Sequence, residues 1–143
     1  AIGKVSSILK ERNIGKLQVW DESEFPAGLL DGLRSAGIVI QSALHPDIRA
    51  GLTGVDAAVA ESGTLLLASG AGRPQTSSLL PEVHISILRK EDIYENLTQV
   101  LALRQLRDAS YVSMISGPSR TADIEMTLTI GVHGPGEVHV ICV

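Results

Sequence analysis

Apolar residues recur along this chain in two patterns, helical stripes and short unbroken runs. In residues 2–12, Val5, Ile8 and Leu9 fall on one helical face, and the Asn-Ile-Gly that follows is a typical helix end. The run at residues 38–40 has no polar alternation, which is typical of a strand covered on both faces. Together the patterns predict helices at 2–12, 26–37 and 92–106, and strands at 17–20, 38–40, 83–88, 111–116 and 138–143.

Because helices and unbroken apolar strands take turns, we expect an α/β fold with an open, mostly parallel sheet flanked by helices on both faces. Residues 55–69 fit either two buried strands joined by a tight turn at Gly63 or one bulged strand. The helix at 92–106 starts with the capping box Asp-Ile-Tyr-Glu. Residues 121–130 alternate as in a strand, but Ser119 can cap a helix and acids follow it, so we predict a short helix there.

Length and composition limit the classes of function. A chain of 143 residues, 44% of them hydrophobic, predicts one domain spanning 1–143, and the absence of an initial Met suggests native residues upstream. The net charge of −4 argues against general nucleic-acid binding, which needs a basic face. No apolar run has membrane-spanning length and no secretory signal is present, so we expect a cytoplasmic protein without a membrane span.

The cysteine and histidine content limits which disulfides, clusters and metal sites this chain could form. One cysteine cannot form an intramolecular disulfide, nor can this chain alone build a cysteine-ligated zinc or iron–sulfur centre. Cys142 falls in an apolar strand and is expected to be a small core residue. His84 and His139 also fall in strands, where hydrogen-bonded structural roles are expected. No histidine pair has metal-site spacing, so we predict no metal.

Four polar segments fall at expected strand ends or turns, and they carry hydroxyl residues beside glycines. Ligands of open α/β sheets bind beyond the carboxyl ends of strands, and arginine suits a carboxylate or phosphate. The segments therefore predict one anion site, although ordinary turns with Ser119 as a helix cap would also explain them. The four segments are residues 53–56, 61–64, 69–73 and 116–120. The residues expected to bind the anion, or to orient the side chains that bind it, are Thr53, Gly63, Thr64, Arg73, Ser116, Ser119, Arg120, Asp123 and Glu125.

Three residues are candidates for acid–base catalysis. Asp56 and Glu61 lie within apolar strand sequence, where an unpaired carboxylate is costly. Each is either a structural acid satisfied by nearby N–H groups or a general base or acid near the ligand. His133 sits in the turn VHGPGE, whose Gly and Pro residues would hold it near a strand opening.

Several long motifs occur in a fixed order from about residue 51 to residue 143: TGVDAAVAESGT, GRP, SLLPEVH, SGPSRTADIE and GVHGP. This set resembles the LUD domain of the lactate utilization protein C family. The resemblance covers roughly two thirds of the chain, and upstream of residue 51 the fit is loose. It implies a fold similar to the ribose-5-phosphate isomerase, glucosamine-6-phosphate isomerase and CoA-transferase group.

The resemblance also implies a function. It suggests a subunit that binds a small carboxylate and acts in the oxidation of L-lactate to pyruvate, beside two partner proteins that carry iron–sulfur clusters. No cofactor is then expected in this chain itself. Two alternatives stay open: a stand-alone enzyme acting on a phosphorylated or acyl (CoA-type) small molecule, and a non-catalytic assembly module.

Overall fold

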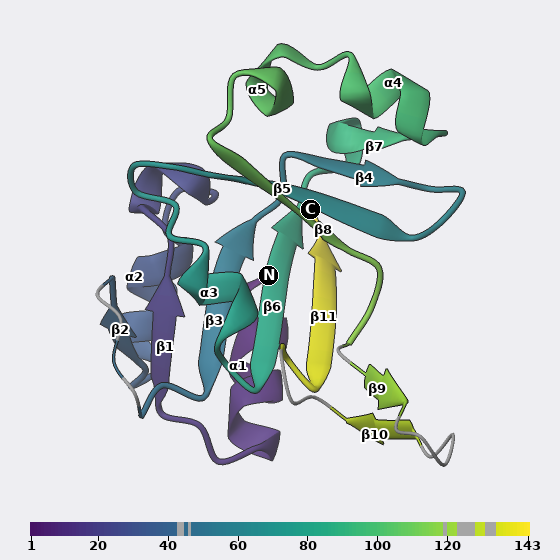
Figure 1. Cartoon of the computed structure of the whole chain (residues 1–143). Coiled ribbons are helices and arrows are strands. Elements are labelled where there is room, and N and C mark those ends of the chain that lie inside the picture. The colour runs from purple at the N-terminus through teal and green to yellow at the C-terminus, as the bar shows by residue number, and fades with distance from the viewer. Residues whose placement is uncertain (43–44, 46, 119, 123–127, 131–133) are drawn as a thin grey trace.

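The computed structural model describes residues 1–42, 45, 47–118, 120–122, 128–130 and 134–143, and its centre is a parallel sheet (Figure 1). The order is β11-β6-β3-β1-β2, and every neighbouring pair is parallel. This confirms the expected α/β fold with a mostly parallel sheet. The strands are β1 (Lys16–Val19), β2 (Val39–Gln41), β3 (Ala50–Gly54), β6 (Val83–Leu88) and β11 (Glu137–Cys142).

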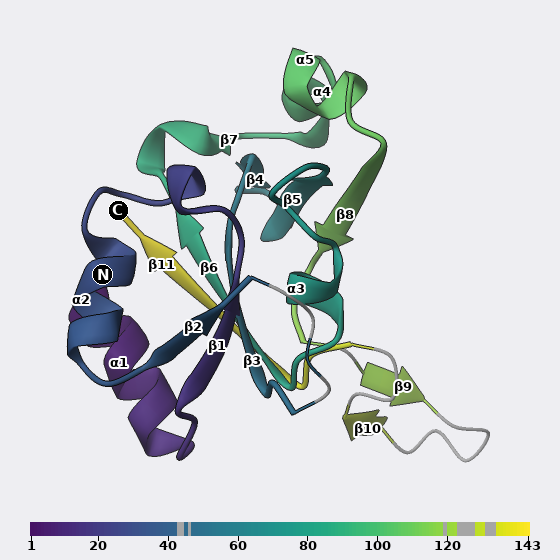
Figure 2. The ribbon, with the colours of Figure 1, turned by 90° about the vertical axis from the view of Figure 1, so that its left-hand side faces the viewer.

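Helices cover both faces of this sheet (Figure 2). α1 (Ile2–Glu11) and α2 (Leu29–Ser35) lie on one face, and α3 (Thr76–Leu79) lies on the other. The α1 helix confirms the predicted stripe, since Val5 and Leu9 are fully buried in the core. α2 begins at Leu29, later than the predicted start at Pro26, because the 3-10 turn η1 (Glu22–Glu24) and a left-handed Gly28 precede it.

A second sheet crosses the carboxyl ends of the parallel strands (Figure 1). Its order is β7-β4-β5-β8, formed by β4 (Ala57–Val59), β5 (Thr64–Ser69), β7 (Ile93–Tyr94) and β8 (Tyr111–Ile115). One face adds Leu65 and Leu67 to the main core, while the other packs Leu66 against α4 (Leu97–Leu101) and α5 (Arg104–Arg107). Both faces are covered, which explains the unbroken apolar sequence, and the hairpin at Gly63 confirms the two-strand alternative.

Two helix predictions were wrong. The described part of residues 121–130 forms antiparallel strands, β9 (Arg120–Ala122) and β10 (Leu128–Ile130), so the strand-like alternation outweighed the capping signals. The second error concerns Asp92, which ends the 3-10 turn η2 (Lys90–Asp92) and does not begin a helix. The helix α4 is capped by Asn96, whose Oδ1 accepts from the Gln99 N–H at 3.1 Å.

Residues of two predicted strands are more exposed to solvent than the sequence indicated. Val39 is 49% exposed because β2 is an edge strand of the parallel sheet, where coverage on both faces was expected. Cys142 was predicted to be a core residue, but its side chain is exposed because β11 is the opposite edge. Within the described segments, no helix has the length and apolarity that a bilayer crossing requires.

Candidate functional site at the carboxyl ends of the parallel strands

The order of the parallel strands creates a crevice between β1 and β3. The chain runs from β1 outward to β2 and then returns to the other side of β1 as β3, so the connections leave in opposite directions. Ligands of open α/β sheets bind at this switch point, outside the carboxyl ends of the strands. A pocket of about 260 Å³ lies there, bordered by Trp20 after β1, by Gly54 at the end of β3 with Val55 and Asp56 after it, and by Arg89 after β6.

One wall of this strand-end pocket is an arginine held between two carboxylates. Arg73 donates from Nη1 to Asp56 Oδ1 at 2.7 Å and from Nη2 to Glu24 Oε2 at 2.5 Å. Its guanidinium also lies over the Trp20 ring, 5.2 Å from the centroid. Hydrogen bonds to Glu24, partly opposed by burial, raise the pKa of Arg73 above its ordinary value. The charge of Arg73 is therefore matched by protein carboxylates before any ligand binds.

Local backbone geometry brings Arg73 to this position. A tight turn pairs Gly70 with Arg73 through two backbone hydrogen bonds, and Gly72 in this turn accepts from the Asp21 N–H at 2.7 Å. Gly72 has φ +72°, and a Cβ there would lie 2.9 Å from the Asp21 Cβ. Glycine is required on both counts. The SGAGR segment is thus a turn that ties the end of β5 to the loop after β1.

Asp56 is a nearly buried carboxylate of the pocket. Its side chain is 7% exposed. One carboxylate oxygen accepts from Arg73, and the other accepts from the Ala68 N–H at 2.7 Å. The sequence left two roles open for Asp56, a structural acid or a general acid or base. These hydrogen bonds are those of a structural acid, and Asp56 also lines the pocket.

Another part of the pocket lining combines a second arginine with a carboxyl group. Arg89 follows β6 directly, and the Asp92 N–H donates to the Arg89 carbonyl at 3.0 Å. Burial, together with the nearby Glu91, raises the pKa of the Asp92 carboxyl. Gln105 of α5 also lines the pocket. Among the described residues, the ion pairs formed by arginine do not include Arg89.

Thr53 lies outside the pocket, in a buried polar cluster beneath α3. His84 Nε2 is 2.9 Å from Thr53 Oγ1 and 3.1 Å from Ser86 Oγ. His84 is fully buried, and this burial lowers its pKa to about 4. The expected hydrogen-bonded structural role fits this geometry. His139 is also hydrogen-bonded, since its Nε2 is 3.0 Å from Glu137 Oε2.

The predicted residues at the other end of β5 form a separate hydroxyl cluster. Thr64 Oγ1 lies 2.8 Å from both Ser62 Oγ and Ser116 Oγ. Thr64 and Ala68 are four residues apart on one strand, so about 13 Å separates this cluster from Asp56. Gly63 and the exposed Glu61 sit in the same hairpin turn. The structure therefore brings Asp56 and Arg73 together but does not bring Glu61, Gly63, Thr64 or Ser116 to them.

The structure does not describe the side chains of five of the predicted site residues. Ser119, Asp123, Glu125 and His133 lie outside the described residues, and of Arg120 only the backbone in β9 is described. Their expected roles stay predictions. Among the residues that are described, no group of three His, Cys, Asp or Glu side chains could hold a metal ion.

The sequence patterns missed several residues that line the pocket: Trp20, Glu24, Arg89, Asp92 and Gln105. Trp20 and Arg89 each follow a parallel strand directly, so the rule that selected Asp56 would have selected them too. Glu24 and Gln105 come from a 3-10 turn and a short helix, and no local signal marks them.

The LUD domain family profile matches residues 3–143. The chain belongs to the LUD domain family. It is 39% identical over 126 residues to a "Lactate utilization protein C" from Halalkalibacterium halodurans, covering 84% of this chain and 49% of that protein. A protein of the same name from Shouchella clausii is 46% identical over 90 residues, covering 59% and 39%. This LUD chain thus spans about half the length, or less, of these curated relatives.

A solved structure supports the fold. The crystal structure of a DUF162 family protein from Deinococcus radiodurans superimposes with a TM-score of 0.73 at 25% sequence identity. The alignment covers 99% of this LUD chain and 81% of that chain. The expected likeness to the sugar-phosphate isomerase and CoA-transferase group stays a prediction.

Proposed function

We propose that this LUD chain works in lactate utilization, as a subunit of a cytoplasmic system that oxidises L-lactate to pyruvate. In this proposal the chain itself binds a small carboxylate in the strand-end pocket. The relatives named for lactate utilization support the process. The observation that carries the site is the pocket at the β1/β3 switch point, which two arginines border. Guanidinium groups suit carboxylates because they offer paired N–H donors.

The redox chemistry is assigned to partners. Oxidation of L-lactate to pyruvate removes two electrons and two protons, one proton from the hydroxyl and one from the carbon that bears it. Iron–sulfur clusters are held by several thiolates, and this chain has one cysteine. We therefore assign the clusters that accept the electrons to partner proteins, and the binding of the substrate or product carboxylate to this chain.

The test is reconstitution. The purified protein is combined with the two iron–sulfur partner proteins that the proposal expects, and L-lactate-dependent reduction of a dye is measured with and without the LUD protein. Addition of the LUD protein is expected to raise the rate, and Arg89→Gln is expected to reduce this gain, while Arg104→Gln on the exposed side of α5 retains it. The proposal fails if the partners reduce the dye equally well alone. A rise in melting temperature with sugar phosphates or acyl-CoA, but not with lactate or pyruvate, would also contradict it.

A further inference from the structure

We infer that Arg89 and Asp92 form a two-point site for a short 2-hydroxy carboxylate, in which Arg89 binds the carboxylate and Asp92 accepts a hydrogen bond from the neighbouring hydroxyl. This inference rests on the proposed function, because it assumes that the strand-end pocket takes a small carboxylate. It adds the chemical class of the ligand and gives the two arginines different roles.

The two arginines differ in how their charges are already used. Arg73 is bound by Asp56 and Glu24 and stacks on Trp20, so a ligand would have to compete with two protein carboxylates for it. Arg89 forms no such pair among the described residues, and it lines the same pocket. Arg89 is therefore the cation that a ligand carboxylate meets, and Arg73 is a positioning residue that shapes the wall.

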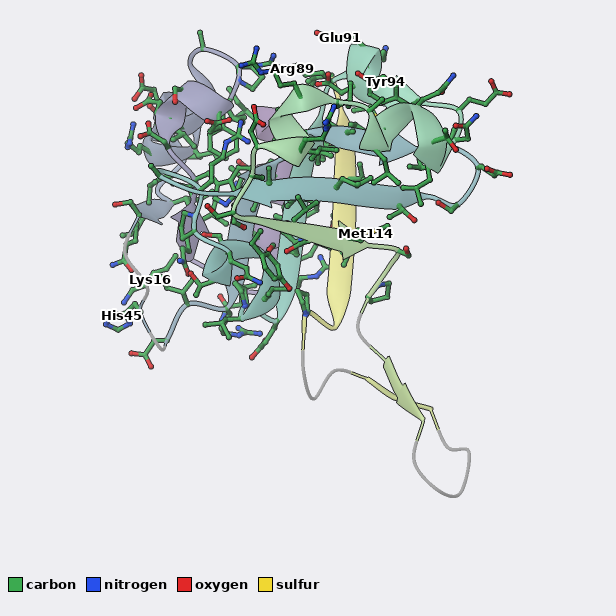
Figure 3. All side chains as sticks on the ribbon, turned by 45° about the horizontal axis from the view of Figure 1, so that its top comes forward. Lys16, His45, Arg89, Glu91, Tyr94 and Met114 are labelled. Carbon is green, nitrogen blue, oxygen red and sulfur yellow. The ribbon has the colours of Figure 1, made fainter. Side chains whose placement is uncertain are left out.

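The 3-10 turn after β6 sets Arg89 and Asp92 side by side. Its closing hydrogen bond runs from the Asp92 N–H to the Arg89 carbonyl at 3.0 Å. The two side chains lie close enough together for the positive charge of Arg89 to oppose the rise in the pKa of Asp92. Both line the pocket, and Glu91 lies between them in the sequence without lining it. Figure 3 shows Arg89 and Glu91 on this connection, beyond the parallel strands.

This pairing of groups matches a 2-hydroxy acid better than other small carboxylates. The carboxylate and the hydroxyl of such an acid sit on adjacent carbons, and the site offers a cation beside an acceptor. A carboxylate such as Asp92 needs a hydrogen-bond donor, which a 2-hydroxy acid supplies and a 2-oxo acid or an unsubstituted acid does not. Gln105 adds an amide to the lining of the pocket.

The experiment is isothermal titration calorimetry of the purified protein with L-lactate, propionate and pyruvate. L-Lactate is expected to bind about tenfold or more tightly than the other two acids, because only lactate donates to Asp92. Arg89→Gln should weaken the binding of all three, and Arg89→Lys should restore part of it. Asp92→Ala should abolish the preference for L-lactate over propionate, because the acceptor of the lactate hydroxyl is lost. Arg104→Gln removes an arginine outside the pocket and should leave all affinities unchanged.

The outcomes separate this inference from the function on which it rests. Equal affinities for L-lactate and propionate, with no effect of Asp92→Ala, would overturn the two-point site and leave a general carboxylate pocket. Lactate binding that survives Arg89→Gln unchanged would overturn the assigned role of Arg89. Absence of binding by any of the three acids would overturn both the site and the carboxylate pocket of the proposed function. Circular dichroism of each variant shows that it is folded before titration.

Discussion

The Asp56 carboxylate connects three segments of chain, and replacing it with alanine should destabilise the fold by about 2–4 kcal/mol. It lies just after β3 and is bound by Arg73 from the loop after β5 and by the Ala68 N–H within β5. Through Arg73 it is also connected to Glu24. Asp56→Ala would leave the Ala68 N–H without this acceptor and Arg73 with one carboxylate in place of two.

The magnitude follows from the burial of the three groups. Hydrogen bonds to a charged group contribute about 1.5–3 kcal/mol each, and Asp56, with a side chain 7% exposed, accepts two such bonds of 2.7 Å. Removing one partner of a fully buried ion pair costs about 3–5 kcal/mol. The cost here stays below the top of that range, because Arg73 is 27% exposed and retains Glu24. Asp56→Asn keeps one acceptor oxygen, so its cost should be about half as large.

The assay is equilibrium unfolding in urea, followed by circular dichroism. Asp56→Ala should lower the midpoint without changing the slope, and the melting temperature should fall by about 2–4 °C per kcal/mol in a chain of this size. Asp108→Asn is the matched control, because its pair with Arg104 is solvent-exposed at 68% and 93%. This control should change stability by less than about 0.5 kcal/mol. If Asp56→Ala unfolds at the same urea concentration as the control, the ion-pair argument for this wall of the pocket is refuted.

Three other predictions test separate features. Gly51→Ala would place a Cβ 1.9 Å from the Ser77 carbonyl oxygen, so urea unfolding should show a loss of about 1–3 kcal/mol or more, whereas Gly3→Ala, with open space around it, should be neutral or stabilising. The pKa of His84 falls from 6.5 to about 4 on folding, so between these pH values the unfolded chain binds more protons than the folded chain. The free energy of unfolding should therefore fall by up to about 3 kcal/mol as the pH drops from 6.5 to 4. His84→Gln should flatten that part of the pH profile, and an unchanged profile would contradict the assignment. Asn96→Ala should lower the free energy of unfolding in urea by about 1 kcal/mol, because α4 loses its cap. An unchanged free energy of unfolding would contradict the assignment of Asn96 as the cap.

The local sequence did not indicate which of the parallel strands would be fully buried. All six residues of β6 are buried, the polar His84 and Ser86 included, because neighbouring strands and helices cover β6 on every side. Residues 38–40 form an unbroken apolar run and residues 138–143 are mostly apolar, yet Val39 and Cys142 are exposed. A run of apolar residues does not encode which strands will be edges, because strand order depends on contacts between distant segments.

The site was predictable in part for a similar reason. The carboxyl-end rule selected Asp56 and Arg73, which do border the pocket. Their mutual ion pair was not foreseen, because 17 residues separate them and the SGAGR turn that brings them together carries no long-range signal. Asp92 was assigned to a helix cap because Asp-x-x-Glu is a common capping pattern. The nearby Asn96-x-x-Gln99 satisfied the helix terminus, which left Asp92 to line the pocket.

The lining of the strand-end pocket is encoded in different parts of the chain. Gly54 and Ile87 belong to the parallel strands β3 and β6 and Trp20 follows β1, while Asp92 and Gln105 belong to the connection that runs from β6 to β11. That connection can change in sequence without altering the register of the five parallel strands. Ligand choice can therefore diverge between relatives while the sheet is conserved. A chimaera that exchanges residues 89–107 with those of another LUD protein should transfer the donor's ligand preference to this scaffold.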